Sequence, residues 1–128
     1  MAITRPDLKL KPDPRVRAVF AMAPVGIYFN RAGLAGVHVP VSIVLGGADA
    51  VLPRAANAAR IRAELPQRPE YRVIPGAGHF VFLAPCTAWL RAQAPLICND
   101  PPGVDRAAVH VQLVDEAARF FRAHLPAR

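Results

Sequence analysis

The stretch Val39–Pro53, which reads VPVSIVLGGADAVLP, constrains the fold more than any other part of the chain. Its first half, from Val41 to Leu45, is mostly aliphatic and β-branched, which is typical of a strand buried on both faces of a parallel sheet. Two glycines end this predicted strand, and Asp49 follows shortly after them. In open α/β sheets, functional groups gather beyond the carboxyl ends of the strands. Asp49 is therefore a candidate site residue.

The same layout recurs later in the chain. Residues 71–74 (YRVI) form another predicted strand, and the turn PGAG that follows leads to His79. Between the two strands, apolar residues recur every three or four positions over about 53–65, which predicts a helix. Strand, helix and strand in this order indicate parallel strands whose carboxyl ends share one edge of the sheet. We therefore expect the side chains of Asp49 and His79 to lie within or close to hydrogen-bond reach.

The remaining segments fit one α/β domain. Arg15–Ala23 is the first predicted strand, and it precedes the central strand at 40–46. The other predicted elements are a loop over 26–38 with a helical turn near Leu34, a short helical stretch through Trp89 and Leu90, a proline-rich loop over 95–103, and an amphipathic helix over 106–125 capped by Asp105. We expect an α/β fold with a three-stranded, mostly parallel sheet and flanking helices. One domain covers 15–128, and residues 1–14 are interpreted as an extended leader.

The chain carries a formal net charge of +7, which raises nucleic acid as a partner. Its basic residues are almost all arginines, scattered singly and without interleaved aromatics, and we interpret them as a solvated surface. No stretch approaches the roughly 18 to 20 apolar residues that span a bilayer. Neither nucleic acid nor a membrane is therefore expected as a partner. No signal peptide is recognised, so the cytoplasm is the default compartment, while export of a full-length parent stays open.

Cys86 and Cys98 lie twelve residues apart in a loop-rich stretch. They can form a local disulfide in an oxidising compartment or stay as two buried thiols in the cytosol. Because the segment between them is proline-rich and can fold back on itself, we expect the two cysteines to come close enough to bridge. Two thiols at this spacing lack a second pair of ligands, so no zinc site is expected, and no cofactor either.

Four segments carry a resemblance to a known family: DPRVRAVFAMAPV, VPVSIVLGGADAVLP, VIPGAGHFVFLAPC and the closing stretch from ICND to FRAHL. Together they run from about Asp13 to Leu125. The chain resembles the carboxyl-terminal part of an α/β-hydrolase, and is most similar to the predicted dienelactone hydrolase group and its esterase and lipase relatives. In such families the catalytic triad runs nucleophile, acid, histidine along the chain. The resemblance implies that Asp49 is the orienting acid, that His79 is the general base, and that the intact enzyme acts on a small ester or lactone.

The nucleophile is the part of this pattern that the sequence does not supply. A hydroxyl reacts at neutral pH only when an imidazole removes its proton, and a carboxylate holds the other imidazole nitrogen. The family's G-x-S-x-G elbow is expected upstream of the first strand, and no such motif is present. The only serine, Ser42, lies inside the central strand and is interpreted as a buried hydroxyl. Cys86 follows a proline in an apolar setting, which disfavours its thiolate, so we expect the chain to be inactive alone.

Several other residues receive structural interpretations. Gly76 and Gly78 are expected to allow the tight turn that presents His79. His110 and Asp105 recur in the resembling family and are expected to bond the proline-rich loop to the last helix. Three aromatic residues are expected to pack in the core, with an acyl pocket as the alternative: Trp89, Phe80 and Phe82.

Three functional hypotheses stay open. The first is the acid and base half of a serine hydrolase, present as a truncated product. The second is half of a split hydrolase whose other chain brings the elbow, and the third is a non-enzymatic binding module on a hydrolase scaffold. The missing half would leave a strand edge and apolar sheet faces without cover, so we expect self-association or a complementing N-terminal half as a partner.

Overall fold

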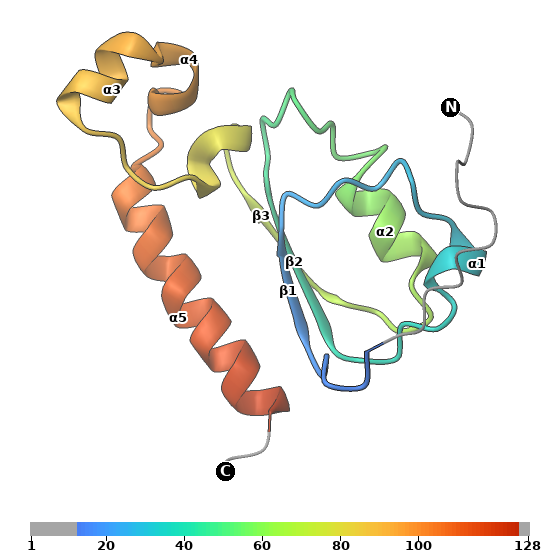
Figure 1. Cartoon of the computed structure of the whole chain (residues 1–128). Coiled ribbons are helices and arrows are strands. Elements are labelled where there is room, and N and C mark those ends of the chain that lie inside the picture. The colour runs from blue at the N-terminus through green and yellow to red at the C-terminus, as the bar shows by residue number, and fades with distance from the viewer. Residues whose placement is uncertain (1–12, 126–128) are drawn as a thin grey trace.

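The computed structural model describes residues 13–125. Three strands form one sheet in the order β1, β2, β3, and both strand pairs are parallel (Figure 1). The α/β class expected from the sequence is therefore confirmed. In chain order the elements are β1 (Val19–Met22), α1 (Arg31–Leu34), β2 (Val41–Gly46), α2 (Ala58–Glu64), β3 (Glu70–Ile74), the 3₁₀ helix η1 (His79–Phe82), α3 (Ala88–Gln93), α4 (Pro95–Cys98) and α5 (Arg106–His124).

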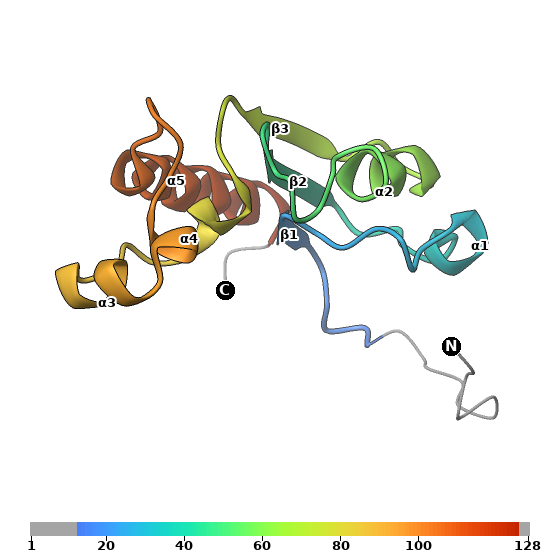
Figure 2. The same cartoon turned by 90° about the horizontal axis from the view of Figure 1, so that it is seen from above.

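Helices cover both faces of the sheet. α5 lies along one face, and α1 and α2 lie on the other, as Figures 1 and 2 show. The side chains of β2 alternate between these layers because successive residues of a strand point to opposite faces. Ile43 and Leu45 pack with Ile61 of α2, whereas Val44 packs with Leu113 of α5. β2 is thus buried on both faces, as its aliphatic composition predicts.

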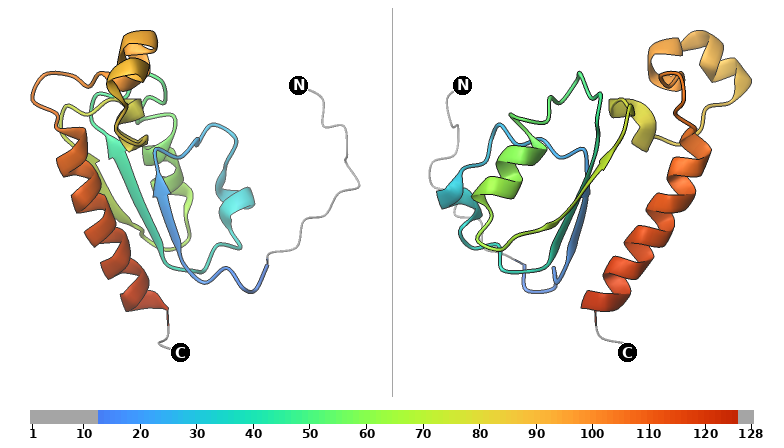
Figure 3. Two further views of the ribbon diagram at one scale, coloured as in Figure 1. Left: turned by 60° about the vertical axis from the view of Figure 1, so that its left-hand side comes forward. Right: turned by 180° about the vertical axis from the view of Figure 1, so that it is seen from behind.

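The carboxyl ends of the three parallel strands lie at one edge of the sheet. η1 follows β3 at this edge, and α3 and α4 form a small helical hairpin beyond it, next to the amino end of α5 (Figures 1 and 3). α5 then runs back along the sheet. The loops after β2 and β3 and the α3–α4 hairpin therefore meet at the same end of the molecule.

β1 is shorter than the predicted strand Arg15–Ala23. Its pairing begins with Val19 opposite Val41, the first residue of β2, so within the part of the chain that the structure describes residues 15–18 have no neighbouring strand to pair with. At the other end the strand stops at Ala23, whose φ of 44° turns the backbone away from the extended conformation. The length of this edge strand is set by where its partner begins, which its own sequence does not show.

Two helix boundaries also differ from the prediction. The helix predicted over 53–65 begins only at Ala58. The residue before it, Asn57, instead joins two loops through its side chain. Asn57 Oδ1 accepts from the backbone N–H of Gly26 at 2.9 Å, and its Nδ2 donates to the Pro53 carbonyl at 3.0 Å. The predicted loop over 95–103 contains α4, in which Pro95 occupies the first helical position, where its missing N–H costs no hydrogen bond.

The other predicted elements are confirmed. A helical turn ends at Leu34, a strand covers 70–74, and α5 begins after Asp105, whose Oδ1 accepts from the backbone N–H of Ala108 at 3.1 Å. The predicted leader lies outside the described residues except for its last two, 13 and 14. Among residues 13–125, no helix is long and apolar enough to cross a membrane.

Candidate functional site

Asp49 and His79 lie side by side at the carboxyl edge of the sheet. Asp49 is in the loop after β2, and His79 begins η1 just after β3, the neighbouring strand. His79 Nδ1 lies 2.8 Å from Asp49 Oδ2. The expected hydrogen-bond distance between these two side chains is therefore confirmed.

The carboxylate of Asp49 is fixed by the backbone of its own loop. Its Oδ1 accepts from the N–H groups of Val51 at 2.9 Å and Leu52 at 2.7 Å. The side chain is only 2% exposed. One oxygen thus holds the loop while the other faces the imidazole, so the acid is preorganised before any ligand arrives.

The turn before η1 places the imidazole of His79. Gly76 has φ +68°, a conformation that L side chains rarely adopt, and it makes the turn that leads out of β3. Gly78 has φ −84°, so of the two glycines expected to allow this turn only Gly76 uses a positive φ. An ionised carboxylate only accepts hydrogen bonds, so Nδ1 of His79 carries the hydrogen toward Asp49. Nε2 is then the nitrogen that can take up a proton.

Two shallow hollows border His79. One of about 190 Å³ is lined, among others, by Val51, Phe80, Leu96 and residues 99–101. The other, of about 250 Å³, is lined by Met22 and Ala23 at the end of β1 and by residues 79, 80, 82 and 83. The imidazole can therefore be approached both from the α4 side and from the free edge of β1.

Neither nucleophile candidate from the sequence reaches His79. Ser42 is 1% exposed and pairs with Glu70 at the start of β3, whereas His79 lies beyond the end of that strand. The interpretation of Ser42 as a buried strand hydroxyl is confirmed. Cys86 is bonded to Cys98 and offers no thiol. Thr87 caps α3 by accepting from the backbone N–H of Leu90.

The three aromatic residues were expected to pack in the core, with an acyl pocket as the alternative, and they differ in their outcome. Trp89 is 72% exposed, so its predicted place in the core is wrong, because α3 buries none of its residues and gives the indole nothing to pack against. Phe80 lines both hollows beside His79, and its ring lies edge-on to the imidazole at 5.3 Å between centroids. Phe82 lines the second hollow and also packs against the core cluster that contains Val44.

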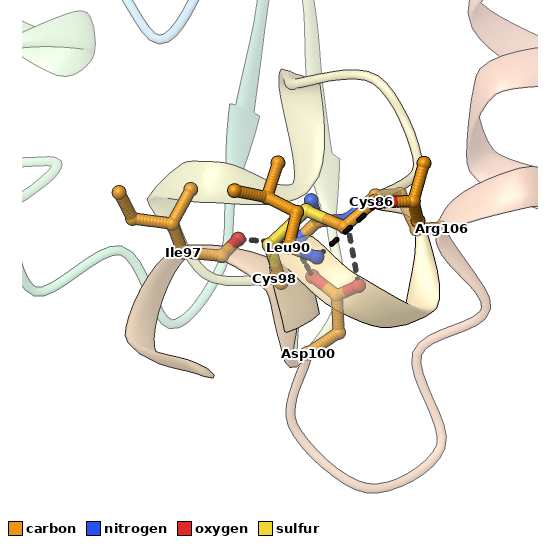
Figure 4. The surroundings of a disulfide bond; sticks show 7 residues. Cys86, Leu90, Ile97, Cys98, Asp100 and Arg106 are labelled. Atoms are coloured by element: carbon orange, nitrogen blue, oxygen red, sulfur yellow. Dashed lines mark hydrogen bonds and ion pairs between the residues drawn. A yellow bond between two sulfur atoms is a disulfide. The ribbon is translucent and has the colours of Figure 1, made fainter. Parts of the chain in front are cut away.

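The predicted approach of the two cysteines is confirmed. Cys86 and Cys98 form a disulfide with 5.6 Å between their Cα atoms (Figure 4). Among the residues that the structure describes, no free cysteine is left. The bridge closes the α3–α4 hairpin at its base.

Arg106 is a residue that sequence reasoning missed. It donates from Nε to Asp100 at 2.8 Å and from Nη2 to Asp100 at 2.9 Å and to the Ile97 carbonyl at 2.8 Å. It therefore bonds the proline-rich loop to α5, the role that was expected for His110 and Asp105. His110 instead pairs through Nε2 with the Val81 carbonyl of η1 at 2.9 Å, and Asp105 caps α5. An arginine at a helix start gives no local signal of burial, since arginines usually stay in water.

No protein-family model, curated protein or solved structure matches this chain. Among residues 13–125, no group of three or more His, Cys, Asp or Glu side chains is arranged to hold a metal ion. The functional interpretation therefore depends on the geometry of Asp49 and His79 and on the resemblance carried by the sequence segments.

Proposed function

We propose that this chain supplies the acid and the base of a serine hydrolase that cleaves carboxylic esters or lactones, on part of an α/β-hydrolase scaffold. The observation that carries the proposal is the 2.8 Å distance between His79 Nδ1 and Asp49 Oδ2 at the carboxyl edge of a parallel sheet. The resemblance to the dienelactone hydrolase group supplies the reaction class. A three-stranded parallel sheet with helices on both faces is consistent with that scaffold.

Each residue has one role in the proposed reaction. Asp49 holds Nδ1 and so fixes the tautomer in which Nε2 of His79 is the base. As a hydroxyl nucleophile attacks the ester carbonyl carbon, Nε2 takes its proton and then gives it to the leaving alkoxide. In the second half, Nε2 takes a proton from water, the resulting hydroxide attacks the acyl group, and the acid is released with the nucleophile reprotonated.

The nucleophile in this proposal comes from a segment or chain outside the described residues. The free edge of β1 is where such a segment fits, because the hollow lined by Met22 and Ala23 opens from that edge onto His79. A strand added alongside β1 would end near the imidazole. The proposal thus includes both a longer parent protein and a split hydrolase.

The hollow on the α4 side favours a small, uncharged substrate group. Its volume of about 190 Å³ is lined by apolar side chains such as Val51, Phe80 and Leu96. Asp100 at its rim is already paired with Arg106, which neutralises the carboxylate. An apolar acyl chain or a lactone ring matches this lining better than a charged group does.

A binding module on the same scaffold is the alternative, and one observation favours it. The chain exposes large apolar side chains in β1 and in the segments on either side of it, and such surfaces commonly bind partners. These residues are Val16, Met22, Val25, Ile27, Tyr28 and Phe29. A binding module needs neither a nucleophile nor the imidazole.

The experiment that tests the proposal is reconstitution with a nucleophile-bearing chain. The product of the adjacent upstream reading frame, if it contains G-x-S-x-G, is coexpressed with this chain and assayed with nitrophenyl butyrate and dihydrocoumarin. Activity is expected only in the mixture, with a loss of about 10³-fold or more for His79→Ala. His38→Ala, which removes an exposed histidine, is the matched control and should retain activity. An upstream frame without the elbow, or an inactive mixture of two folded chains, would favour the binding module.

A further inference from the structure

The α3–α4 hairpin has almost no apolar core of its own. α3 buries none of its residues, and Cys98 is the buried residue of α4. Trp89 and Leu96 are 72% and 81% exposed. Helices of six and four residues do not persist in water without support. The hairpin therefore depends on what attaches it at its base.

Two attachments hold that base. The disulfide joins Cys86, which follows η1, to Cys98 at the end of α4. Beside it, Arg106 bonds the Asp100 carboxylate and the Ile97 carbonyl (Figure 4). Arg106 is 6% exposed, so these bonds lie away from solvent. With the disulfide broken, the hydrogen bonds of Arg106 to Asp100 and Ile97 would be the attachment that remains at the base.

The same segment forms one wall of the hollow beside His79. Leu96, Asn99, Asp100 and Pro101 line that hollow. Asn99 and Asp100 also line a larger hollow of about 440 Å³, which the two cysteines and Arg106 border as well. The segment thus separates the two hollows, and its loosening would widen the approach to the imidazole.

We propose that the Cys86–Cys98 disulfide is a redox switch that controls access to His79. A dithiol reductant donates two electrons and two protons, the S–S bond breaks, two thiols form, and the reductant leaves as a disulfide. The α3–α4 hairpin then unfolds locally, and Leu96 leaves the wall of the hollow. Asp49 and the two amides that hold it lie outside the hairpin, so the hydrogen bond to His79 persists. Cys86 is partly exposed, which gives the reductant access.

Hydrogen exchange and chemical modification test this switch without any need for catalysis. Amide exchange is measured for the oxidised chain and after reduction with dithiothreitol. Exchange over 88–98 should accelerate about tenfold or more, while exchange over 41–46 stays unchanged. The rate at which diethyl pyrocarbonate modifies His79 is compared between the oxidised chain and Cys86→Ala/Cys98→Ala, which needs no reductant. It should rise about fivefold in the variant because the hollow is open, while the exposed His124 of α5 reacts equally in both.

Two outcomes would overturn the proposal. One is unchanged exchange over 88–98 after reduction. The other is faster exchange in the hairpin with no change in the modification rate of His79. If the double variant loses protection over 41–46, the modification is measured on the reduced wild-type chain, with its thiols capped by iodoacetamide and the reductant removed. Neither readout depends on ester cleavage. The redox switch can therefore fail while the proposed hydrolase function stands, and the hydrolase function can fail while the switch stands.

Discussion

Gly46 ends β2 directly against the carbonyl oxygen of Ala77 in the turn before His79. A Cβ atom at position 46 would overlap that oxygen and would lie 2.9 Å from the carbonyl oxygen of Gly78. The absence of a side chain at the end of one strand therefore lets the histidine turn of the next strand approach it.

Gly46→Ala should push the histidine turn away from Asp49. Both contacted atoms belong to the backbone, so the turn must shift, and we expect a loss of about 1–3 kcal/mol in the free energy of unfolding. Urea unfolding measures this loss, and the amide chemical shifts of residues 76–79 report the displacement. Gly36→Ala is the matched control, because nothing lies within 4 Å of a Cβ there. Equal losses of stability in Gly46→Ala and Gly36→Ala would show that the close approach of Gly46 to the histidine turn does not matter.

Substitutions of Asp49 should separate its two roles. Asp49→Asn keeps an oxygen for the N–H groups of Val51 and Leu52 but turns an amide toward Nδ1 of His79. We expect stability to change by less than about 1 kcal/mol, while the histidine tautomer switches, because Nδ1 must then accept. Asp49→Ala leaves both amides without their acceptor and should cost about 1–3 kcal/mol. Nitrogen-15 shifts of the imidazole and urea unfolding give the two readouts. If the histidine tautomer is unchanged in Asp49→Asn, Asp49 does not fix the tautomer of His79.

The isolated chain should show no serine-hydrolase activity. Its serine is buried at the far end of β2 from His79, and its cysteines form a disulfide. Neither nitrophenyl esters nor a fluorophosphonate probe should react above the rate in buffer. Specific labelling of Ser42 that disappears in His79→Ala would show this expectation to be wrong.

The free edge of β1 should make the isolated chain self-associate. Among the described residues, β1 pairs with β2 alone, contains no proline, and ends with Met22 at 48% exposure. Sedimentation at micromolar concentration should reveal dimers or larger species despite the net charge of +7. Met22→Lys should shift the population to monomer, whereas Val111→Lys, at an exposed site on α5, should not. A wild-type monomer that unfolds cooperatively would instead favour the binding module.

Stability should fall in acid partly through the ion pair between β3 and α5. A hydrogen bond from Arg119 lowers the pKa of Glu70 below its ordinary value, and the two groups lie 2.7 Å apart. The contribution of this pair is therefore complete above the pKa of Glu70 in the unfolded chain and is lost as the pH falls through its lower pKa in the folded chain. Because both side chains are more than a third exposed, Glu70→Gln should cost at most about 1 kcal/mol at neutral pH.

Urea unfolding across a pH series measures this contribution. The difference between the wild type and Glu70→Gln should shrink below pH of about 4 and vanish in stronger acid. Asp115→Asn, which removes a carboxylate from an exposed position on α5, should show no comparable pH-dependent loss. A difference that stays constant through the acid range would rule out the ion pair as its cause.

The sequence was sufficient to predict the features that depend on short-range pattern. The aliphatic composition of β2 and the order of strand, helix and strand imply that Asp49 and His79 meet at one edge. The bridge between Cys86 and Cys98 could be anticipated because they are only twelve positions apart and the intervening segment folds back.

Other features depend on partners that are distant in the chain. The extent of β1 follows from where β2 begins, and the late start of α2 follows from the bond between Asn57 and Gly26. The four residues of α4 are too few to show helical periodicity. Arg106 becomes a buried link only because Asp100 folds back onto the start of α5.

Asp49 and His79, the proposed acid and base, lie 30 positions apart in the chain, in the loop after β2 and just after β3. β2 and β3 are neighbours both in the chain and in the sheet, so the hydrogen bond between Asp49 and His79 needs no third strand between them. In the proposed function, the acid and the base are therefore inherited together, whichever segment brings the nucleophile.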